Sequence, residues 1–309
     1  MTTPASSNKY QTQQLPSPRQ THSYLRDLME KRGLRPKNKL GQNFLIDLNI
    51  LDLIVRRAEL THDDLALEIG SGTGGLTGRL VGTAGAVVSV EIDSSFADMV
   101  REIIPEGPRF TLVHVDALKN KNELNPVMMQ AMADMQARTG TRRIKLVANL
   151  PYCVATPIIS NLMLTDLPIE RMIVTVQAEI GERMIATPGK KAYGSLAVLM
   201  QSLADSWIVR RLPPTVFWPK PKVWSTIVGI SPNAVKRARV GDVVKFRNFL
   251  RDLYTHRRKN LRGALVGSPS KDFGKAEVDS KLAELGIEGT VRAEALDVEQ
   301  HLRLCEVFG

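Results

Sequence analysis

A chain of 309 residues with 43% hydrophobic and 24% charged side chains has the composition of a globular protein of about two domains. The composition excludes a disulfide-stapled mini-protein, because the cysteines are Cys153 and Cys305 alone, and no run approaches the ~20 apolar residues of a membrane helix. The first residues lack a secretory pattern, so we expect a cytoplasmic protein without membrane association.

The charge of the chain is positive and unevenly distributed. Lys and Arg outnumber Asp and Glu by 42 to 32, which gives a net charge of +10. Residues 1–47 carry +5 and residues 236–262 carry +8, so the rest of the chain is slightly acidic. A near-neutral body with two basic segments is typical of a polyanion-binding protein, because phosphate contacts release counterions. The alternative is ordinary solubility charge.

The N-terminal part predicts a tail followed by helices. Residues 1–20 are rich in Thr, Ser, Gln and Pro and nearly free of aliphatic side chains, which predicts a disordered tail. Ser23 can cap a short helix over residues 24–31, and aliphatic residues at helical spacing predict one helix from Phe44 to Leu60. We therefore expect two helices before the first strand.

Seven short apolar runs follow, the first five separated by helical patterns. Such alternation predicts parallel crossovers and a doubly wound α/β sheet, with the last two strands forming an antiparallel hairpin at one edge. The expected strands are Leu65–Ile69, Val87–Ile92, Phe110–Val115, Ile144–Leu150, Met172–Gln177, Trp207–Arg211 and Thr226–Ile230.

After Ser231-Pro232 the pattern is helical and contains no strand-like run. This shift predicts a first domain over residues 21–230 and a helical second domain over residues 231–309. The basic face of the second domain would consist of Lys245, Arg247, Arg251, Arg257, Arg258, Lys259 and Arg262.

A glycine cluster lies where the first expected strand ends. Gly70, Gly72 and Gly75 form a Gly-x-Gly-x-x-Gly pattern, which lets a ligand approach the backbone closely. Glu91 follows at the ~20-residue spacing of dinucleotide sites and can accept hydrogen bonds from both ribose hydroxyls. The pattern predicts a site for an adenosine-bearing cofactor, and NAD would also satisfy it.

Two more carboxylates stand near this loop. Asp116 closes the third expected strand, where it could accept the exocyclic N–H of adenine or cap a helix. Glu68 could brace the loop or meet the cationic end of a cofactor.

Asn149-Leu150-Pro151-Tyr152 ends the fourth expected strand, at the same edge as Gly70 and Glu91. The Asn149 oxygen and a backbone carbonyl held by Pro151 can accept both N–H bonds of an exocyclic amine, while the Tyr152 ring stacks on a flipped base. The tetrapeptide therefore indicates chemistry on a planar base.

Taken together, the motifs resemble those of the ribosomal RNA adenine dimethyltransferases of the kasugamycin-resistance type, which modify small-subunit rRNA. The resemblance covers about residues 20–309. Its motifs are Leu40-Gly41-Gln42-Asn43-Phe44-Leu45, the Gly70–Gly74 loop, Val90-Glu91-Ile92-Asp93, Asn149-Leu150-Pro151-Tyr152, Lys191-Ala192-Tyr193-Gly194, Phe217 with Pro221-Lys222-Val223, and Arg257-Arg258-Lys259 with Arg262.

The resemblance implies a Rossmann-like, S-adenosylmethionine-dependent methyltransferase fold with a mostly parallel seven-stranded sheet and a small all-helical C-terminal domain. It implies S-adenosyl-L-methionine as cofactor and N6,N6-dimethylation of two adjacent adenosines near the 3′ end of small-subunit rRNA, on a pre-ribosomal particle. We expect a monomer. The implied cofactor contacts are Asn43, Leu45, Gly70, Glu91, Asp116 and Asn149.

The resemblance also implies residues for the base and the RNA. Asn149, Leu150 and Pro151 would hold the amine, and Tyr152 and Phe217 would sandwich the ring, although Phe217 could instead be a core aromatic. The implied RNA-backbone contacts are Arg257, Arg258, Lys259 and Arg262. The alternative interpretation is that these residues belong to a solvated helix face and a flexible loop.

Three departures from the family pattern concern substrate geometry. Cys153 stands where the family usually has Asn, Trp224 where it usually has Asp, and Pro219-Lys220-Pro221 replaces a run of prolines. Cys153 could be read as a covalent nucleophile of the cytosine C5 type, but a structural thiol is the preferred interpretation.

Three other functions stay open. A non-catalytic assembly or transcription factor is disfavoured by the full set of motif residues. A large-subunit rRNA methyltransferase of the macrolide-resistance type is disfavoured by the long helical C-terminal part, by Leu150 and by Thr156-Pro157. An NAD oxidoreductase is the weakest alternative, because no acid for hydride transfer, such as a well-placed His or a Tyr-x-x-x-Lys pattern, accompanies the glycine loop. The histidines lack metal-ligand spacing, so we expect no metal.

Overall fold

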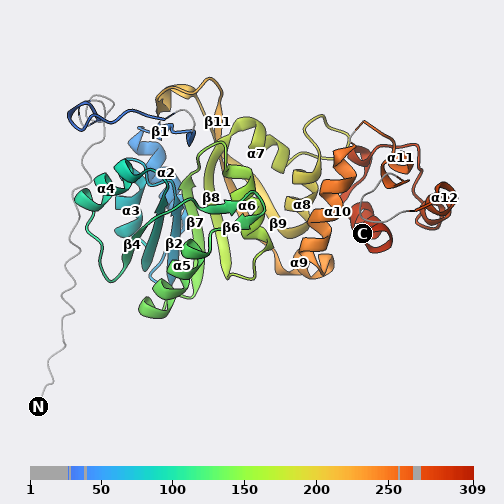
Figure 1. Ribbon diagram of the computed structural model, residues 1–309, viewed down its shortest axis with the longest axis horizontal. Helices are drawn as coiled ribbons and strands as arrows, with labels where there is room; N and C mark the ends of the chain where they lie inside the picture. The colour runs from blue at the N-terminus through green and yellow to red at the C-terminus, as the bar shows by residue number, and fades with distance from the viewer. Residues whose placement is uncertain (1–26, 28, 38–39, 257, 267–272) are drawn as a thin grey trace, which may run out of the picture.

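The computed structural model describes residues 27, 29–37, 40–256, 258–266 and 273–309 (Figure 1). The predicted disordered tail over residues 1–20 and the predicted RNA contact Arg257 lie outside the described residues.

A mixed seven-stranded sheet forms the centre of the larger half of the molecule, in the order β4-β3-β2-β7-β8-β11-β9. Strands β4, β3, β2, β7 and β8 pair in parallel, whereas β11 runs antiparallel to both β8 and β9. This confirms the predicted sheet and its antiparallel edge. The strands are β2 (Asp64–Ile69), β3 (Ala86–Glu91), β4 (Phe110–His114), β7 (Arg143–Asn149), β8 (Ile169–Gln177), β9 (Ala204–Leu212) and β11 (Ser225–Pro232).

Helices cover both faces of the sheet, which explains why β2 and β3 are mostly apolar and are buried along their whole length. Successive side chains of β2 point to opposite faces, so Leu65 and Leu67 join one core cluster and Ala66 joins the other. One face carries α2 (Leu48–Ala58), α3 (Gly75–Val81) and α4 (Ser94–Ile103); the other carries α5 (Pro126–Thr139), α6 (Ala155–Leu164) and α7 (Ala178–Met184).

The predicted single helix from Phe44 to Leu60 is wrong at its start. Phe44 and Leu45 form β1 (Phe44–Leu45), which pairs antiparallel with β10 (Phe217–Trp218) just after the 3-10 turn η2 (Pro214–Val216). The Asp47 side chain accepts hydrogen bonds from the backbone nitrogens of Asn49 and Ile50, so the helix begins only after it. A hairpin of β5 (Leu118–Asn120) and β6 (Glu123–Leu124) was also not predicted.

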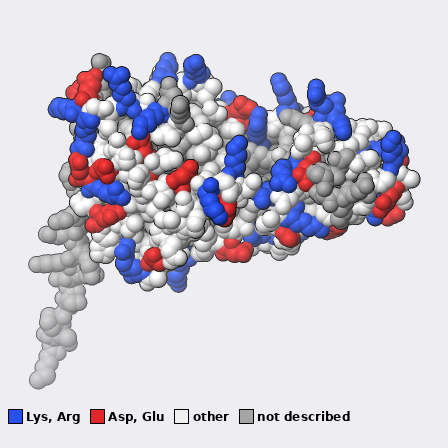
Figure 2. All heavy atoms as spheres, in the orientation of Figure 1, with Lys and Arg blue, Asp and Glu red and all other residues white. Residues whose placement is uncertain are grey.

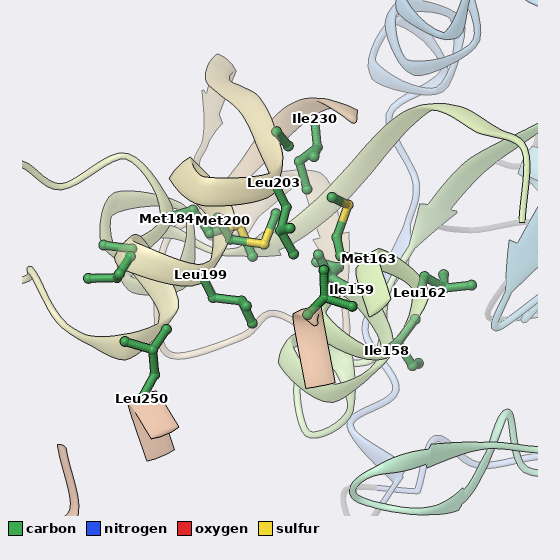
Figure 3. Close-up of a cluster of buried hydrophobic side chains, with 14 of the residues drawn as sticks. Ile158, Ile159, Leu162, Met163, Met184, Leu199, Met200, Leu203, Ile230 and Leu250 are labelled. Carbon is green, nitrogen blue, oxygen red and sulfur yellow. The ribbon is translucent and has the colours of Figure 1, made fainter. Parts of the chain in front are cut away.

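Beyond Pro232 the described residues form helices and no strand. Leu250 packs into the same core cluster as Ile159, Leu203 and Ile230 (Figure 3), so apolar packing continues across residue 231 and the boundary there stays a prediction. The elements beyond Pro232 are α9 (Ala234–Val240), α10 (Val243–Thr255), α11 (Leu261–Val266), α12 (Lys275–Glu284), the 3-10 turn η3 (Ala293–Ala295) and α13 (Val298–Phe308). Earlier in the chain, α8 (Ser195–Leu203) precedes β9. Over the described ranges, every helix is too short or too polar to span a bilayer.

Candidate active site

A crevice opens at the carboxyl ends of β2, β3 and β7, beneath the segment that leads into β1. It consists of two adjoining cavities of about 210 Å³ and about 50 Å³. Both cavities are lined by Leu40, Gly70, Glu91, Ile92 and Pro151. Carboxyl ends of parallel strands converge at one edge of a sheet, which is why motifs far apart in the chain meet here.

The glycine loop after β2 has a backbone that only glycine accommodates without strain. Gly70 and Gly72 have φ angles of 84° and 50°. A Cβ atom at Gly70 would stand 3.3 Å from Cδ of Pro151, and one at Gly72 would stand 2.9 Å from the Phe44 ring. The missing side chains therefore bring the loop backbone to the wall of the crevice.

Glu91 ends β3 at the floor of the crevice and is 5% exposed. Its carboxylate accepts hydrogen bonds from the backbone nitrogens of Gly72 at 2.9 Å and Asp93 at 3.0 Å, and from the Ser71 hydroxyl at 3.4 Å. Burial raises the pKa of Glu91, against these hydrogen bonds. The carboxylate lines the crevice, so it is placed to accept a hydrogen bond from a ligand donor such as a ribose hydroxyl.

Glu68 braces the loop from behind and does not line the crevice. Its Oε2 accepts hydrogen bonds from the hydroxyls of Thr77 at 2.7 Å and Ser89 at 2.6 Å, while Oε1 has no partner among the described residues. Burial, with a smaller contribution from the nearby Glu91 carboxylate, raises the pKa of Glu68 to about 7 against the two hydrogen bonds, which lower it. The geometry supports the bracing role over contact with a cofactor.

Asn149 presents an unsatisfied acceptor to the site. Its Nδ2 donates to the backbone oxygen of Asn43 at 2.9 Å, which fixes the orientation of the amide. The opposite atom, Oδ1, is buried and has no hydrogen-bond partner within the described residues. Leaving a buried acceptor unpaired costs ~1–3 kcal/mol, so this oxygen is suited to a donor brought by a ligand.

Tyr152 places an aromatic ring on the crevice wall beside Asn149. Its hydroxyl lies 2.5 Å from Oγ of Ser225, the first residue of β11, and this contact holds the ring in place. Burial raises the pKa of Tyr152, so the phenol stays neutral at physiological pH. The preceding Pro151 lies against Gly70 and stiffens the turn out of β7.

The segment over the crevice is held by polar contacts to Asp93, which begins α4. Asp93 accepts a hydrogen bond from Nε2 of Gln42 at 3.1 Å and pairs with Nζ of Lys37 at 2.9 Å. Phe44 packs on Phe96, with ring centroids 4.9 Å apart. These positioning contacts were not assigned from the sequence, although Gln42 and Asp93 lie inside the quoted motifs.

The structure brings most of the predicted site residues together. Those that line the crevice are Asn43, Gly70, Glu91, Asp116, Asn149, Leu150, Pro151 and Tyr152. Asp116 also accepts a hydrogen bond from the backbone nitrogen of Leu118 at 2.9 Å, bracing the turn into β5. Cys153 lines the larger cavity with an exposed side chain.

Leu45 and Phe217 do not line the crevice. They face each other in the β1–β10 pair and are 5% and 2% exposed within the core cluster on the α2 side of the sheet. In this conformation Phe217 occupies the core position that was its alternative interpretation.

A groove of about 800 Å³ adjoins the crevice, because Asp116, Cys153 and Val154 line both. It runs between the β5–β6 hairpin, α6, α8 and α10. Four basic residues line it, namely Lys119, Lys121, Arg247 and Arg251. The charge pattern had pointed to the two arginines, but the two lysines were missed because their hairpin was not predicted.

The predicted RNA contacts Arg258, Lys259 and Arg262 lie on the helical part, around the start of α11, where Figure 2 shows many Lys and Arg side chains. Arg258 and Lys259 are exposed, and Arg262 pairs with Asp279 of α12. Figure 1 places α11 at the opposite end of the molecule from β1, so these residues form a separate basic surface and do not line the crevice.

Comparison with known proteins gives a consistent result. The family model for ribosomal RNA adenine dimethylase matches residues 33–308. Two curated relatives carry the name ribosomal RNA small subunit methyltransferase A. The protein from Lachnoclostridium phytofermentans is 36% identical over 88% of this chain and 91% of its own length, and that from Pediococcus pentosaceus is 38% identical over 90% and 92%.

Two solved structures are similar in fold. A dimethyladenosine transferase from Plasmodium falciparum has a TM-score of 0.66 at 24% identity, covering 84% of this chain and 94% of its own. The 23S rRNA methyltransferase ErmE has a TM-score of 0.60 at 25% identity, covering 86% and 99%. Both similarities extend over the sheet and into the helical part.

Proposed function

The chain belongs to the ribosomal RNA adenine dimethylase family, and on that premise we propose how its crevice carries out dimethylation of small-subunit rRNA with S-adenosylmethionine. The proposed targets are two adjacent adenosines near the 3′ end of that RNA. We also propose that the protein acts as a cytoplasmic monomer, with a catalytic domain over residues 21–230 and an RNA-binding domain over residues 231–309.

The observation that carries the proposed catalytic role is the unpaired, buried Oδ1 of Asn149. Adenine N6 carries two N–H bonds, and an amide oxygen can accept one of them. The hydrogen bond from Nδ2 of Asn149 to the backbone oxygen of Asn43 keeps this oxygen, and not the NH₂ group, facing the ligand. The neighbouring Tyr152 ring offers a face for the base. A carbonyl oxygen, a rigid proline and an aromatic ring thus match the edge and the face of a flipped adenine.

The residues around the crevice fit the methyl donor. The adenosine part of the donor can approach the backbone at Gly70, where no side chain stands in the way. The carboxylates of Glu91 and Asp116 can accept hydrogen bonds from it, and Asn43 lines the smaller cavity of the crevice. When bound, S-adenosylmethionine supplies an electrophilic methyl group. We propose that Leu45 contacts the donor through its backbone, because its side chain is buried in the core.

The chain's own contribution to the reaction is positioning and charge stabilisation. The lone pair of N6 is delocalised into the ring, and hydrogen bonds from both N–H groups to acceptors favour the pyramidal amine, whose lone pair is free. Positive charge that develops on the amine is stabilised by Oδ1 of Asn149 and by the backbone oxygen of Leu150. Orientation of this kind can supply ~7–11 kcal/mol of the barrier reduction. The amine loses one proton to solvent as the N–CH₃ bond forms and the S–CH₃ bond of the donor breaks, which leaves a neutral thioether. In the second methylation the amine has one N–H left, which one of the two acceptors holds.

RNA would be held by the basic surfaces outside the crevice. The groove with Lys119, Lys121, Arg247 and Arg251 adjoins the site and can track a phosphate backbone. Arg258, Lys259 and Arg262 would provide a second contact farther along the helical part. Arg257, which lies outside the described residues, is proposed as an RNA contact from the sequence alone. Phe217 could join Tyr152 at the base only if the β1–β10 pair opens.

The test is methyl transfer from labelled S-adenosylmethionine to ribosomal subunits that lack the modification. We expect the purified protein to label small subunits, with two methyl groups on each of two adjacent adenosines located by mass spectrometry, and to leave large subunits unlabelled. Labelling of large subunits alone would favour the macrolide-resistance type. Donor binding without transfer to either subunit, together with normal subunit maturation by Asn149→Ala, would favour an assembly factor.

A further inference from the structure

We propose that Trp224, with Lys220 and Lys222, forms a stacking platform for the nucleotide next to the target adenosine. This inference rests on the proposed function and deepens it, because it assigns a residue that holds the substrate RNA outside the crevice. The loop from Pro219 to Trp224 links β10 to β11 and stands above the carboxyl ends of the strands, close to β1 (Figure 1).

The side chain of Trp224 is unusually exposed for an indole. Its exposed fraction is 55%, and the neighbouring Val223 is 43% exposed. Within the described part of the chain the indole has no hydrogen bond or ring contact. The two exposed side chains form a small apolar patch with one flat aromatic face, which suits a ligand that is itself flat.

The backbone beneath the indole is fixed, although the side chain is free. The carbonyl oxygen of Trp224 accepts a hydrogen bond from the backbone nitrogen of Ala178 at 2.9 Å. Ser225, the next residue, pairs with Gln177 of β8 and Leu212 of β9. A rigid base under an exposed ring reduces the entropy that is lost when a base stacks on it.

Charge favours an anionic partner at this loop. Residues 219–225 contain two lysines and no carboxylate, and neither lysine is paired with a carboxylate within the described residues. Glu179 and Glu182 on the adjacent α7 are already paired with Arg183 and Arg211. Figure 2 shows Lys or Arg side chains projecting from the top of the molecule, where this loop lies. An aromatic face close to unpaired lysines in the same loop is a combination that binds single-stranded nucleic acid.

The platform is directly connected to the site. Ser225 follows Trp224 and its Oγ lies 2.5 Å from the hydroxyl of Tyr152, the ring proposed to stack on the target base. The backbone of the platform therefore lies next to the site, and we infer that a nucleotide in the crevice leaves its neighbour in the strand within reach of Trp224. The partner is thus a base of the same RNA strand, and not a separate ligand.

The test uses W224A, W224L and W224F with undermodified small subunits and with a short single-stranded RNA that contains two adjacent adenosines. We expect W224A and W224L to raise the KM for subunits about 10-fold, within the range for loss of one base–aromatic stack, with kcat and donor affinity unchanged. W224F should stay within about threefold of wild type. V235A, which shortens a side chain that is 75% exposed on α9, is the matched control and should change nothing.

Fluorescence provides a readout that folding defects do not mimic. The RNA should quench the tryptophan emission of wild type, and W224F should still bind the RNA but lose the part of the quenching that comes from the exposed indole. Trp218, which stacks near Phe44 of the crevice, can report RNA binding in both proteins. Unchanged KM and quenching in W224A, in an enzyme that transfers methyl groups, would overturn this proposal alone. A KM change without any effect on RNA binding would assign the loop to a ribosomal protein and also overturn it. Absence of transfer by wild type would instead refute the proposed function.

Discussion

The side-chain amide of Asn149 donates to the backbone oxygen of Asn43 at 2.9 Å, across 106 residues of chain. This hydrogen bond joins the end of β7 to the segment that covers the crevice. It also decides which atom of the amide faces the ligand, because a backbone carbonyl can only accept. The covering segment therefore orients the group that is proposed to grip the target amine.

Replacing Asn149 with alanine removes the acceptor while leaving the glycine loop and Glu91 in place. We expect kcat to fall by about 10²–10³, the usual effect of removing one preorganised hydrogen-bonding group from a developing charge. The dissociation constant of S-adenosylmethionine, measured by calorimetry, should change by less than about tenfold. Asn49→Ala, on the exposed side of α2, serves as the control and should match wild type. Equal kcat in N149A and wild type would contradict the role.

Gly70→Ala tests the close approach of the loop to the crevice wall. The new Cβ would lie 3.3 Å from Cδ of Pro151 on a backbone with φ of 84°, a conformation that costs an L-residue ~1–2 kcal/mol. We expect donor affinity to weaken at least tenfold and Tm to fall by several degrees. Gly82→Ala, at a φ of −76° after α3, should leave donor binding intact. If both variants bind the donor equally well, the loop is not the binding element.

The sheet and the crevice were predictable because both depend on local patterns. Short apolar runs alternating with helical patterns identified the seven strands, and residues that end parallel strands, such as Glu91 and Asn149, must meet at one edge. The tetrapeptide ending in Tyr152 was recognisable because its chemistry lies within four consecutive residues.

The features that were missed depend on partners far away in the chain. Leu45 lies in an aliphatic pattern that continues into α2, and only its pairing with Phe217 makes it a strand residue with a buried side chain. The groove combines Lys119 of a short polar hairpin with Arg251 of α10. The periodicity of a single segment cannot predict that two distant segments lie side by side. The sequence could therefore indicate the basic residues but not the groove that they line.

Asp64 and Lys145 form a buried ion pair at the amino ends of the strands, on the side of the sheet away from the crevice. Nζ of Lys145 lies 3.1 Å from Oδ2 of Asp64, and both side chains are almost fully buried. Asp64→Ala leaves the buried ammonium with a longer pair to Glu170 at 3.7 Å and also removes a partner of Arg143, so we expect it to lower the free energy of unfolding by about 3 kcal/mol in urea titrations. Glu123→Gln removes an exposed ion pair with Lys119 and should leave the urea midpoint unchanged. A midpoint of D64A equal to that of wild type would show that the pair does not stabilise the fold.

Glu68 should make stability depend on pH in the neutral range. Its pKa is about 7 in the folded protein, mainly because of burial, and near 4.5 when the chain is unfolded. Between these values the folded state holds a proton that the unfolded state has released, so the free energy of unfolding decreases as pH rises from about 4.5 to 7 and is constant above. The full span corresponds to ~3 kcal/mol. Glu68→Gln keeps the shape and removes this titration, so the difference between wild type and variant, followed by urea unfolding from pH 5 to 8, should show the decrease. A difference that does not change with pH would mean that Glu68 is ionised in the folded protein throughout this range.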